Sequence, residues 1–226
     1  SLDGGSCTAN FVFTSLDNQT VYLGTAAHCF SNDINTQTNG CEADIKKLGA
    51  TMEVSGGGKA KLVYSSWSMM QAKNETDADL CLGNDFALLQ LSDKDGNATN
   101  PALERWGGPT AIADAAVARE KVLSYGNSGT RPEDSALSPR EGFVLTPGRR
   151  CDTSVIFPNP AIPGDSGSPV ILGDGRALGD FVSIGLFPDA GQGKVCLLAD
   201  VMEYASRNGV HVQLATWELL DSGVLS

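Results

Sequence analysis

The sequence predicts an all-β protein, built as a pair of sandwiches or barrels. Short apolar segments recur along the chain, and each is bounded by turn-forming residues. The 26 glycines and 10 prolines among 226 residues favour frequent turns over long helices. A hydrophobic fraction of 41% with 19% charged residues is typical of a globular chain that can bury a sizeable core.

The predicted strands follow one another from the N-terminus. Residues 11–29 indicate two strands around a polar turn at 17–19, and further strands are expected over 59–66 and 85–93. In the second half, strands are expected over 121–125, 140–146, 151–158, 169–172, 176–185 and 194–201. Asp174 and Gly175 predict a hairpin turn. Helical periodicity is expected only near the C-terminus, over 213–223.

The best linker candidate is the segment 93–110, "DKDGNATNPALERWGGPT", which is rich in proline, glycine and asparagine. The chain shows no internal repeat and no low-complexity segment. We therefore expect two all-β halves, residues 1–100 and residues 101–226.

The charge balance excludes one class of partner. A net charge of −11 and a pI of about 4.5 argue against nucleic-acid binding, because phosphate binding needs clustered lysine and arginine. The same charge favours solubility and can steer cationic substrates. The apolar runs are too short to span a membrane, and no signal-like segment is present. We therefore expect the mature form of a secreted protein.

Cysteine usage indicates disulfides and an oxidising, extracellular-type compartment. No CxxC pair occurs and the chain has only two histidines, so a zinc site is poorly supported. Three Asn-x-Ser/Thr sequons, at Asn18, Asn74 and Asn97, fit surface loops. The six cysteines are Cys7, Cys29, Cys41, Cys81, Cys151 and Cys196.

The stretch "PGDSGSPV", residues 163–170, carries the strongest chemical signal in the chain. Two glycines flank Asp165 and Ser166, and a strand-like segment follows at once. A tight turn here would expose the Ser166 hydroxyl beside free backbone amides, an arrangement that suits a nucleophile. An ordinary glycine-rich surface turn is the competing interpretation.

A serine nucleophile needs a base to accept its proton, and the chain offers two candidates. His28 lies among small residues in "LGTAAHCF" and is followed by Cys29, which can tie the segment down. His211 alternates with Val210 and Val212, as a strand or surface residue does. We therefore take His28 as the candidate base.

Three segments in the order "TAAHC", "NDFALLQL" and "GDSGSPV" resemble the signature segments of the chymotrypsin/trypsin-like serine proteases. The resemblance extends from Cys7 to about Val201, although outside the three motifs it is one of pattern only. It implies two perpendicular six-stranded antiparallel β-barrels with a short C-terminal helix. It also implies a secreted serine endopeptidase that works through an acyl-enzyme intermediate, the mechanism worked out for this same family.

The resemblance assigns roles residue by residue. Ser166 would be the nucleophile, His28 the general base and acid, and Asp85 the group that orients His28. The backbone amides of Gly164 and Ser166 would form the oxyanion hole. "VSIG" resembles the strand along which the substrate lies, where Ser183 would help to hold Asp85 and Gly185 would pair with substrate main chain. Asp77 and Asp79 are rivals of Asp85 that fit solvated loop positions better.

The chain departs from the family pattern near its N-terminus. Animal members begin with a segment whose terminal amine pairs with the acid before the nucleophile, and "SLDGGSC" does not supply it. Asp165 therefore needs another cation, for which Arg149 and Arg150 are the candidates. The Cys7–Cys29 pair matches the family, whereas Cys41–Cys81 and Cys151–Cys196 follow only if each half pairs within itself, and other connectivities stay open.

The resemblance also locates the pocket for the side chain on the acyl side of the cleaved bond. Its floor corresponds to Pro160, and Pro160, Ala161 and Ile162 carry no charge. We therefore expect cleavage after uncharged apolar or aromatic residues. Strict cleavage after arginine or lysine would instead indicate Asp189 or Asp180 as a counter-ion.

Two other classes of protein compete with this interpretation. A protease fold reused as a binding module, catalytically weak or inactive, would usually have lost one of the three residues. An α/β-hydrolase would place the histidine after the serine, which is not the order here. We expect protein or peptide substrates, protein inhibitors as possible partners, a monomer, and no cofactor, metal, nucleic acid or membrane span.

Overall fold

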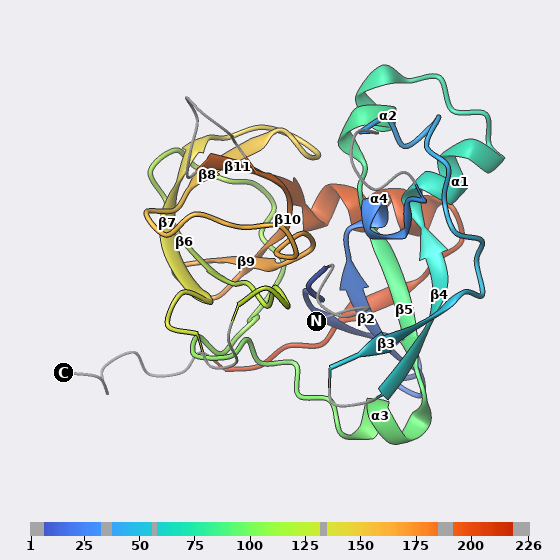
Figure 1. The fold of residues 1–226 in the computed structure, drawn as a ribbon, viewed down its shortest axis with the longest axis horizontal. Helices are drawn as coiled ribbons and strands as arrows, with labels where there is room; N and C mark the ends of the chain where they lie inside the picture. Colours follow the sequence, from blue (N-terminus) through green and yellow to red (C-terminus); the bar gives the residue numbers. More distant parts are fainter. Residues whose placement is uncertain (1–6, 33–37, 56–57, 132–134, 185–191, 219–226) are drawn as a thin grey trace.

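The structure is a computed structural model that describes residues 7–32, 38–55, 58–131, 135–184 and 192–218. Two six-stranded sheets, each wholly antiparallel in its strand pairs, lie side by side (Figure 1). The all-β prediction with two six-stranded sheets is therefore confirmed, although the strand order is that of a closed barrel only for the second sheet.

The first sheet has the strand order β12-β1-β2-β5-β4-β3. The edge strand β12 comes from the C-terminal part of the chain. It pairs with β1, where Leu214 lies opposite Phe13. The C-terminal segment therefore returns to the N-terminal sheet. The strands are β1 (Val12–Ser15), β2 (Val21–Thr25), β3 (Thr51–Val54), β4 (Gly58–Ser65), β5 (Ala87–Leu91) and β12 (Val212–Leu214).

The second sheet closes into a barrel in the order β10-β11-β8-β7-β6-β9. The Asp174–Gly175 hairpin is confirmed, since it joins β9 to β10 and Gly175 has φ of 86°. The strands are β6 (Lys121–Tyr125), β7 (Pro139–Thr146), β8 (Thr153–Ile156), β9 (Pro169–Leu172), β10 (Ala177–Ile184) and β11 (Gln192–Leu197).

The prediction for the C-terminal helix is wrong in position. Residues 213–214 lie in β12, and residues 219–223 of the predicted helix are outside the described residues. The helix is instead α4 (Leu198–Arg207), whose first four residues, 198–201, were expected to continue a strand. Leu198, Val201 and Ala205 are spaced for one helix face and are buried, so packing of that face decides the conformation.

In the described part of the first half, four shorter helical segments connect the strands and were not predicted. They are η2 (Ala27–Phe30), α1 (Ser66–Ala72), α2 (Ala78–Gly83) and α3 (Asp93–Asn97). Side chains of Ser65, Asp77 and Ser92 cap the last three by accepting hydrogen bonds from backbone N–H groups. None of the helices in the described ranges is long and apolar enough to cross a membrane.

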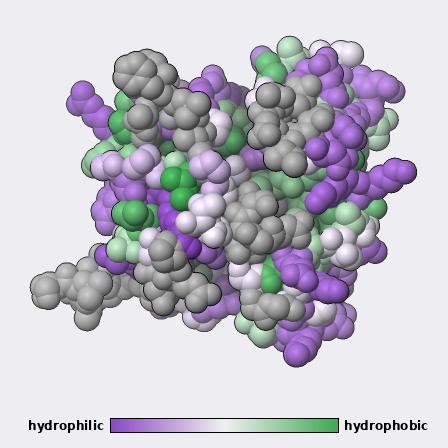
Figure 2. Space-filling view, in the orientation of Figure 1, coloured by the Kyte–Doolittle hydropathy of each residue, from purple (hydrophilic) through white to green (hydrophobic). Residues whose placement is uncertain are grey.

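The apolar core has three parts, one inside each sheet and one between them. The part between the sheets combines Phe13 and Phe86 of the first half with Ile171, Leu198 and Val201 of the second. Helix α4 runs across this junction (Figure 1). Figure 2 shows hydrophilic residues along the outer edge of the half that carries β3, β4 and α3, while apolar residues form small separate groups on this face. The two halves are therefore joined by buried apolar contact.

All six cysteines form disulfides, and each bond lies within one half of the chain. The bonds are Cys7–Cys29, Cys41–Cys81 and Cys151–Cys196, which confirms the three expected pairs. Cys7–Cys29 ties the N-terminal segment to η2, the short helix that carries His28. The domain boundary expected near residue 100 stays a prediction.

We predict that replacing Cys7 and Cys29 together by alanine destabilises the protein by about 2–5 kcal/mol. The bond constrains the unfolded chain and fixes the η2 segment, and urea unfolding monitored by tryptophan fluorescence measures the loss. The comparison is the double alanine variant of Cys41 and Cys81, which removes another disulfide of the same half, with a sequence separation of 40. Equal stability of the wild type and the Cys7/Cys29 variant would contradict this prediction.

Candidate active site

His28 and Asp85 meet because the two strands that precede and follow them are paired. In the antiparallel pair of β2 and β5, Thr25 lies opposite Ala87. His28 comes three residues after Thr25, and Asp85 two residues before Ala87, so both lie just beyond the same end of the strand pair. The order of the strands thus brings together residues that are far apart in the sequence.

The two residues form a close pair. The Nδ1 atom of His28 lies 2.6 Å from Oδ2 of Asp85, and the backbone N–H of His28 donates to Oδ1 at 2.8 Å. With Nδ1 donating to the carboxylate, the neutral imidazole keeps its acceptor lone pair on Nε2. Asp85 is buried, whereas His28 is partly exposed. The arrangement can therefore accept a proton at a defined ring atom.

Two opposing effects set the pKa of His28. Burial lowers this pKa, but the negative charge of Asp85 and its hydrogen bond raise it by more. The net result is a pKa above the ordinary value of 6.5 for histidine.

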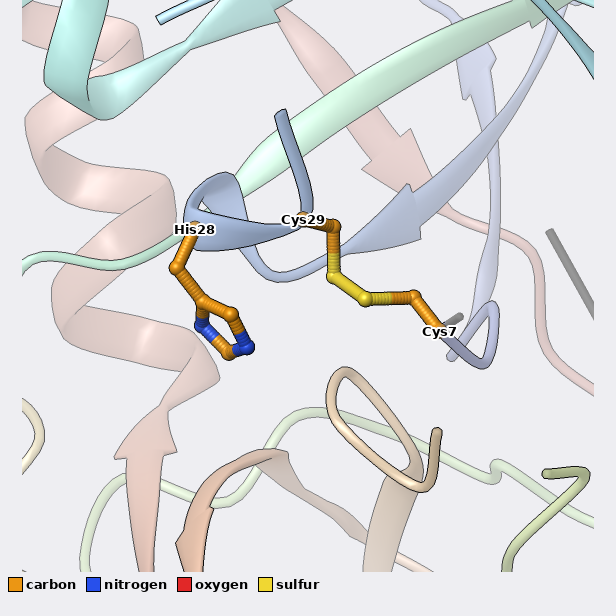
Figure 3. A group of neighbouring side chains, drawn as sticks. All are labelled: Cys7, His28 and Cys29. Carbon is orange, nitrogen blue, oxygen red and sulfur yellow. A yellow bond between two sulfur atoms is a disulfide. The ribbon is translucent and has the colours of Figure 1, made fainter. Parts of the chain in front are cut away.

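The side chains of Cys7, His28 and Cys29 lie close together (Figure 3), and the atoms that could bind a metal ion are within 4.8 Å of one another. The two sulfur atoms are bonded to each other in a disulfide and offer no thiolate. The group therefore does not fit a metal ion. The disulfide instead ties η2 to the N-terminal segment. From η2, the His28 ring projects toward the second half of the chain (Figure 3).

The "PGDSGSPV" segment forms a tight turn that leads into β9. Gly164 and Gly167 have φ of 97° and 85°, in the region that side chains other than glycine rarely adopt. The backbone N–H of Ser168 donates to the carbonyl of Asp165, and that of Asp165 donates to Ile162. Within the described chain, the N–H groups of Gly164 and Ser166 donate to no other residue.

This turn docks on the segment that leads to His28. The backbone N–H of Thr8 donates to the carbonyl of Ser166, and the Thr8 hydroxyl donates to the carbonyl of Gly164, both at 2.8 Å. A Cβ atom added at Gly167 would lie 2.4 Å from both Thr25 Oγ1 and the Thr8 carbonyl oxygen. Glycine at position 167 therefore allows the two halves to touch here.

Ser166 is partly exposed beside the His28 segment. Among the described residues, no hydrogen bond joins its hydroxyl to His28. In enzymes without bound substrate such contacts are often long and tighten only in the complex. The structure thus brings together the His28–Asp85 pair and the Ser166 turn, one from each half of the chain.

Asp165 has a different cation from the one expected. Its Oδ1 lies 2.6 Å from Nη1 of Arg131, and its Oδ2 lies 3.1 Å from Nη1 of Arg140. The expectation of Arg149 or Arg150 is wrong, because Arg149 pairs with Asp200 and Arg150 lies near Asp77 and Asp79 on the surface.

Arg140 lies inside the barrel, where a cation requires special support. Its guanidinium stacks over the rings of Phe157 and Phe181 and donates to the Ser124 hydroxyl. Burial lowers the pKa of Arg140 to about 10, with Asp165 partly offsetting this effect. The sequence signal was its inward position in β7, where it alternates with the buried Gly142 and Val144.

The structure describes some of the expected substrate-binding residues and not others. Pro160 is exposed, Ala161 is buried and Ile162 is half-buried, with its N–H donating to Asp165. Ser183 is exposed, and among the described residues no hydrogen bond joins it to Asp85. Gly185 and Asp189 lie outside the described residues.

The remaining candidates lie elsewhere. Asp77 and Asp79 sit at the start of α2, where both lie near Arg150. His211 is exposed near β12 and lies 3.3 Å from the Ser206 hydroxyl. Asp180, which was considered as a pocket counter-ion, is fully buried in β10.

Several solved proteases resemble this fold. Protease A of Thermobifida fusca matches with a TM-score of 0.54 and 15% identity, covering 93% of this chain and 91% of that chain. The Nocardiopsis protease matches with a TM-score of 0.54 and 16% identity, covering 95% and 96%. A glutamic acid specific serine protease that uses a histidine triad in substrate binding matches with a TM-score of 0.54 and 19% identity, covering 95% and 97%.

These likenesses define the fold as that of the chymotrypsin-like serine proteases. The family model described as a trypsin-like peptidase domain matches residues 7–179. The chain therefore belongs to the trypsin-like peptidases. No curated protein matches it at a significant level.

We predict that the pKa of His28, followed by NMR of the imidazole, lies above 6.5 in the wild type. An Asp85→Asn variant should lower it by about 1–3 pH units, because it removes the charge while burial remains. A His211→Gln variant assigns the signals and serves as the control, since His211 contacts the Ser206 hydroxyl and is not part of the pair. Equal His28 pKa values in the wild type and Asp85→Asn would refute the electrostatic pairing.

Proposed function

We propose that this protein is a secreted serine endopeptidase that hydrolyses peptide bonds through an acyl-enzyme intermediate. Ser166 is the nucleophile, His28 the general base and acid, and Asp85 the group that orients His28. The observation that carries the proposal is the His28–Asp85 pair, at 2.6 Å, beside the docked turn that carries Ser166.

The reaction begins with a proton transfer from Ser166 to His28. As Ser166 Oγ attacks the substrate carbonyl carbon, its proton passes to Nε2 of His28, and a tetrahedral oxyanion forms. His28 then gives this proton to the leaving amine, the C–N bond breaks, and an acyl-serine ester remains. Water repeats the sequence: His28 takes its proton, hydroxide attacks the ester, and the proton returns to Ser166.

Asp85 acts throughout as an anion that holds the imidazole. Its two hydrogen bonds from His28 fix the ring and keep the proton on Nδ1, which leaves Nε2 free to accept. The same negative charge stabilises the imidazolium that forms in the transition state. Activity therefore requires neutral His28 and is lost as the pH falls through the raised His28 pKa.

The N–H groups of Gly164 and Ser166 serve as the oxyanion hole. Two features support this role: neither group donates to another described residue, and the intervening residue, Asp165, is anchored by two arginines. Donors held in place before the reaction stabilise developing charge without reorganisation, and each is worth roughly 3–4 kcal/mol in comparable enzymes.

We propose protein or peptide substrates cleaved after uncharged apolar or aromatic residues. We assign the main-chain contacts with substrate to Ser183 and Gly185, and the pocket to Pro160, Ala161 and Ile162, none of which bears a charge. A histidine triad like that of the glutamic acid specific relative cannot be built, because the chain has only two histidines. The three disulfides support an extracellular location, where such bonds persist.

We predict that Ser166→Ala loses peptidase activity by several orders of magnitude and no longer reacts with a fluorophosphonate probe. The unfolding transition should be unchanged, because the hydroxyl is partly exposed and makes no hydrogen bond within the described chain. Peptide mapping of the labelled wild type should place the probe on Ser166.

The matched control is Ser206→Ala, which removes an exposed serine hydroxyl from α4. This variant should keep full activity and labelling. A Ser166→Ala protein with a tenth of wild-type activity would overturn the proposal. A wild type that folds but neither labels nor cleaves would identify a protease fold used for binding.

We predict that a peptide library yields cleavage after leucine, phenylalanine or tyrosine. A buried unpaired cation or carboxylate is costly in a pocket that offers no opposite charge. Introducing a charge at the pocket floor, as Pro160→Asp, should shift the preference toward arginine and lysine. Strict cleavage after arginine or lysine by the wild type would contradict the pocket assignment.

A further inference from the structure

Asp180 is a carboxyl group with no solvent exposure and with neither oxygen hydrogen-bonded among the described residues. It lies in β10, opposite Pro169 of β9 and Cys196 of β11. The next residue, Phe181, is held to the Ser166 turn by two backbone hydrogen bonds, with Ser168 and Gly167. Asp180 is therefore one residue from the strand position that braces this turn.

The Asp180 side chain faces the junction between the two halves. Phe181 points into the barrel core, whereas Val182, on the opposite face of the strand, packs against the cluster between the sheets. Adjacent side chains of a strand point to opposite faces, and the register shift of β10 comes only after Phe181, so Asp180 lies on the face opposite Phe181. This is the side on which Phe86, the residue after Asp85, is buried.

Within this region, Asp85 is the charged group that acts on Asp180. Burial raises the pKa of Asp180 well above its ordinary value, and the negative charge of Asp85 raises it further. β9 contributes no titratable side chain. On the opposite face of β10, Arg140 and Asp165 pair with each other in the barrel.

The other charged residues of the packed elements are engaged at the surface. On β11, Lys194 pairs with the exposed Asp152. On α4, Asp200 pairs with Arg149, and Glu203 pairs with Arg207, while the buried face of this helix is apolar. Tyr64 of β4 belongs to the cluster between the sheets and is affected by Tyr204 of α4, and burial raises the pKa of both phenols.

We propose that Asp180 is a positioning residue of the His28–Asp85 pair, a neutral carboxylic acid whose O–H donates toward the Asp85 carboxylate through one buried water. This role rests on the proposed function and replaces the support of Asp85 expected from Ser183. No direct hydrogen bond joins the two carboxyl groups in the described chain, and both Asp180 oxygens lack a partner there, so we assign the missing partner to a bridging water.

The proton on Asp180 determines the charge next to His28. With Asp180 neutral, Asp85 is the single carboxylate that faces the imidazole, and it receives a hydrogen bond from its buried side as well as from His28. Ionised Asp180 would leave a second buried carboxylate without a partner, which is costly in itself and repels Asp85. Two neighbouring carboxyl groups therefore take different protonation states.

The test compares Asp180→Asn, which keeps a neutral donor of the same shape, with Asp180→Val, which fills the space without a donor. We expect kcat of Asp180→Asn to stay within about threefold of wild type, and kcat of Asp180→Val to fall about tenfold or more with KM unchanged. Equal activity of Asp180→Val and wild type would overturn the positioning role.

Spectroscopy decides the protonation state without any use of activity. The infrared spectrum of the wild type at neutral pH should contain a carboxylic-acid C=O band that Asp180→Asn lacks. The NMR titration of His28 should be the same in both proteins. Absence of the band, or a His28 pKa about 1 unit lower in Asp180→Asn, would show an ionised Asp180 and refute the proposal.

The pH dependence of unfolding is a third test of the protonation state of Asp180. Because the folded-state pKa of Asp180 is raised, its stabilising contribution is complete below the unfolded pKa and is lost as the pH rises. The unfolding constant of the wild type should therefore grow relative to that of Asp180→Asn by about tenfold per pH unit, starting near pH 4. A ratio independent of pH would contradict a neutral Asp180.

These readings separate the two proposals. If Ser166→Ala keeps its activity, the proposed function fails, while the infrared band and the unfolding ratio still decide the state of Asp180. If Ser166→Ala is inactive but Asp180→Val matches wild type, the function stands and the role of Asp180 is refuted.

Discussion

The geometry of the candidate site depends on one buried ionic cluster. Asp165 is fully buried, and its carboxylate receives hydrogen bonds from Arg131, Arg140 and the backbone of Ile162. A buried carboxylate is tolerated only when paired in this way, so the surrounding chain has little freedom. Ser166 follows Asp165 directly, and Gly164 precedes it. The cluster therefore sets the direction of the N–H groups proposed to bind the oxyanion.

The turn that the cluster fixes can act with His28 only because the two halves of the chain are in contact. Thr8 contributes hydrogen bonds to the carbonyls of both Gly164 and Ser166, and the Cys7–Cys29 disulfide next to it fixes the helix that carries His28. One short N-terminal segment thus touches both parts of the site. The apolar cluster between the sheets, which includes Phe86 and Ile171, stabilises the contact between the two halves.

The sequence predicted what depends on local pattern and could not predict what depends on pairing across the chain. Strands such as β5 and β9 are short apolar runs between turns, and their assignment needs no tertiary information. The segments 198–207 and 212–214 are different. The first is a helix because one face packs at the junction, and the second is a strand because β1 offers its edge. Neither partner is visible in the local sequence.

The same distinction holds for the site. His28, Asp85 and Ser166 could be proposed as site residues because each lies in a recognisable motif. The cation of Asp165 could not, since an arginine carries no local sign of its partner. Arg149 and Arg150 were nearer in sequence to Asp165 than Arg131 and Arg140 are, yet they lie on the surface. The alternation of Arg140 with Val144 in β7 was the usable signal, because it puts a charged residue on the buried face.

Asp165 and Asp180 show how environment separates two identical side chains. Both are fully buried in the second half of the chain, on either side of the Ser166 turn and the strand that braces it. Asp165 faces the barrel interior, where two guanidinium groups meet it. Asp180 faces the junction, where the charge that acts on it within the described chain is the Asp85 carboxylate. A paired anion is suited to anchoring a turn, and a carboxyl group without a cation is suited to carrying a proton. The fold can therefore use one residue type for both purposes, because the two faces of the barrel wall differ in charge.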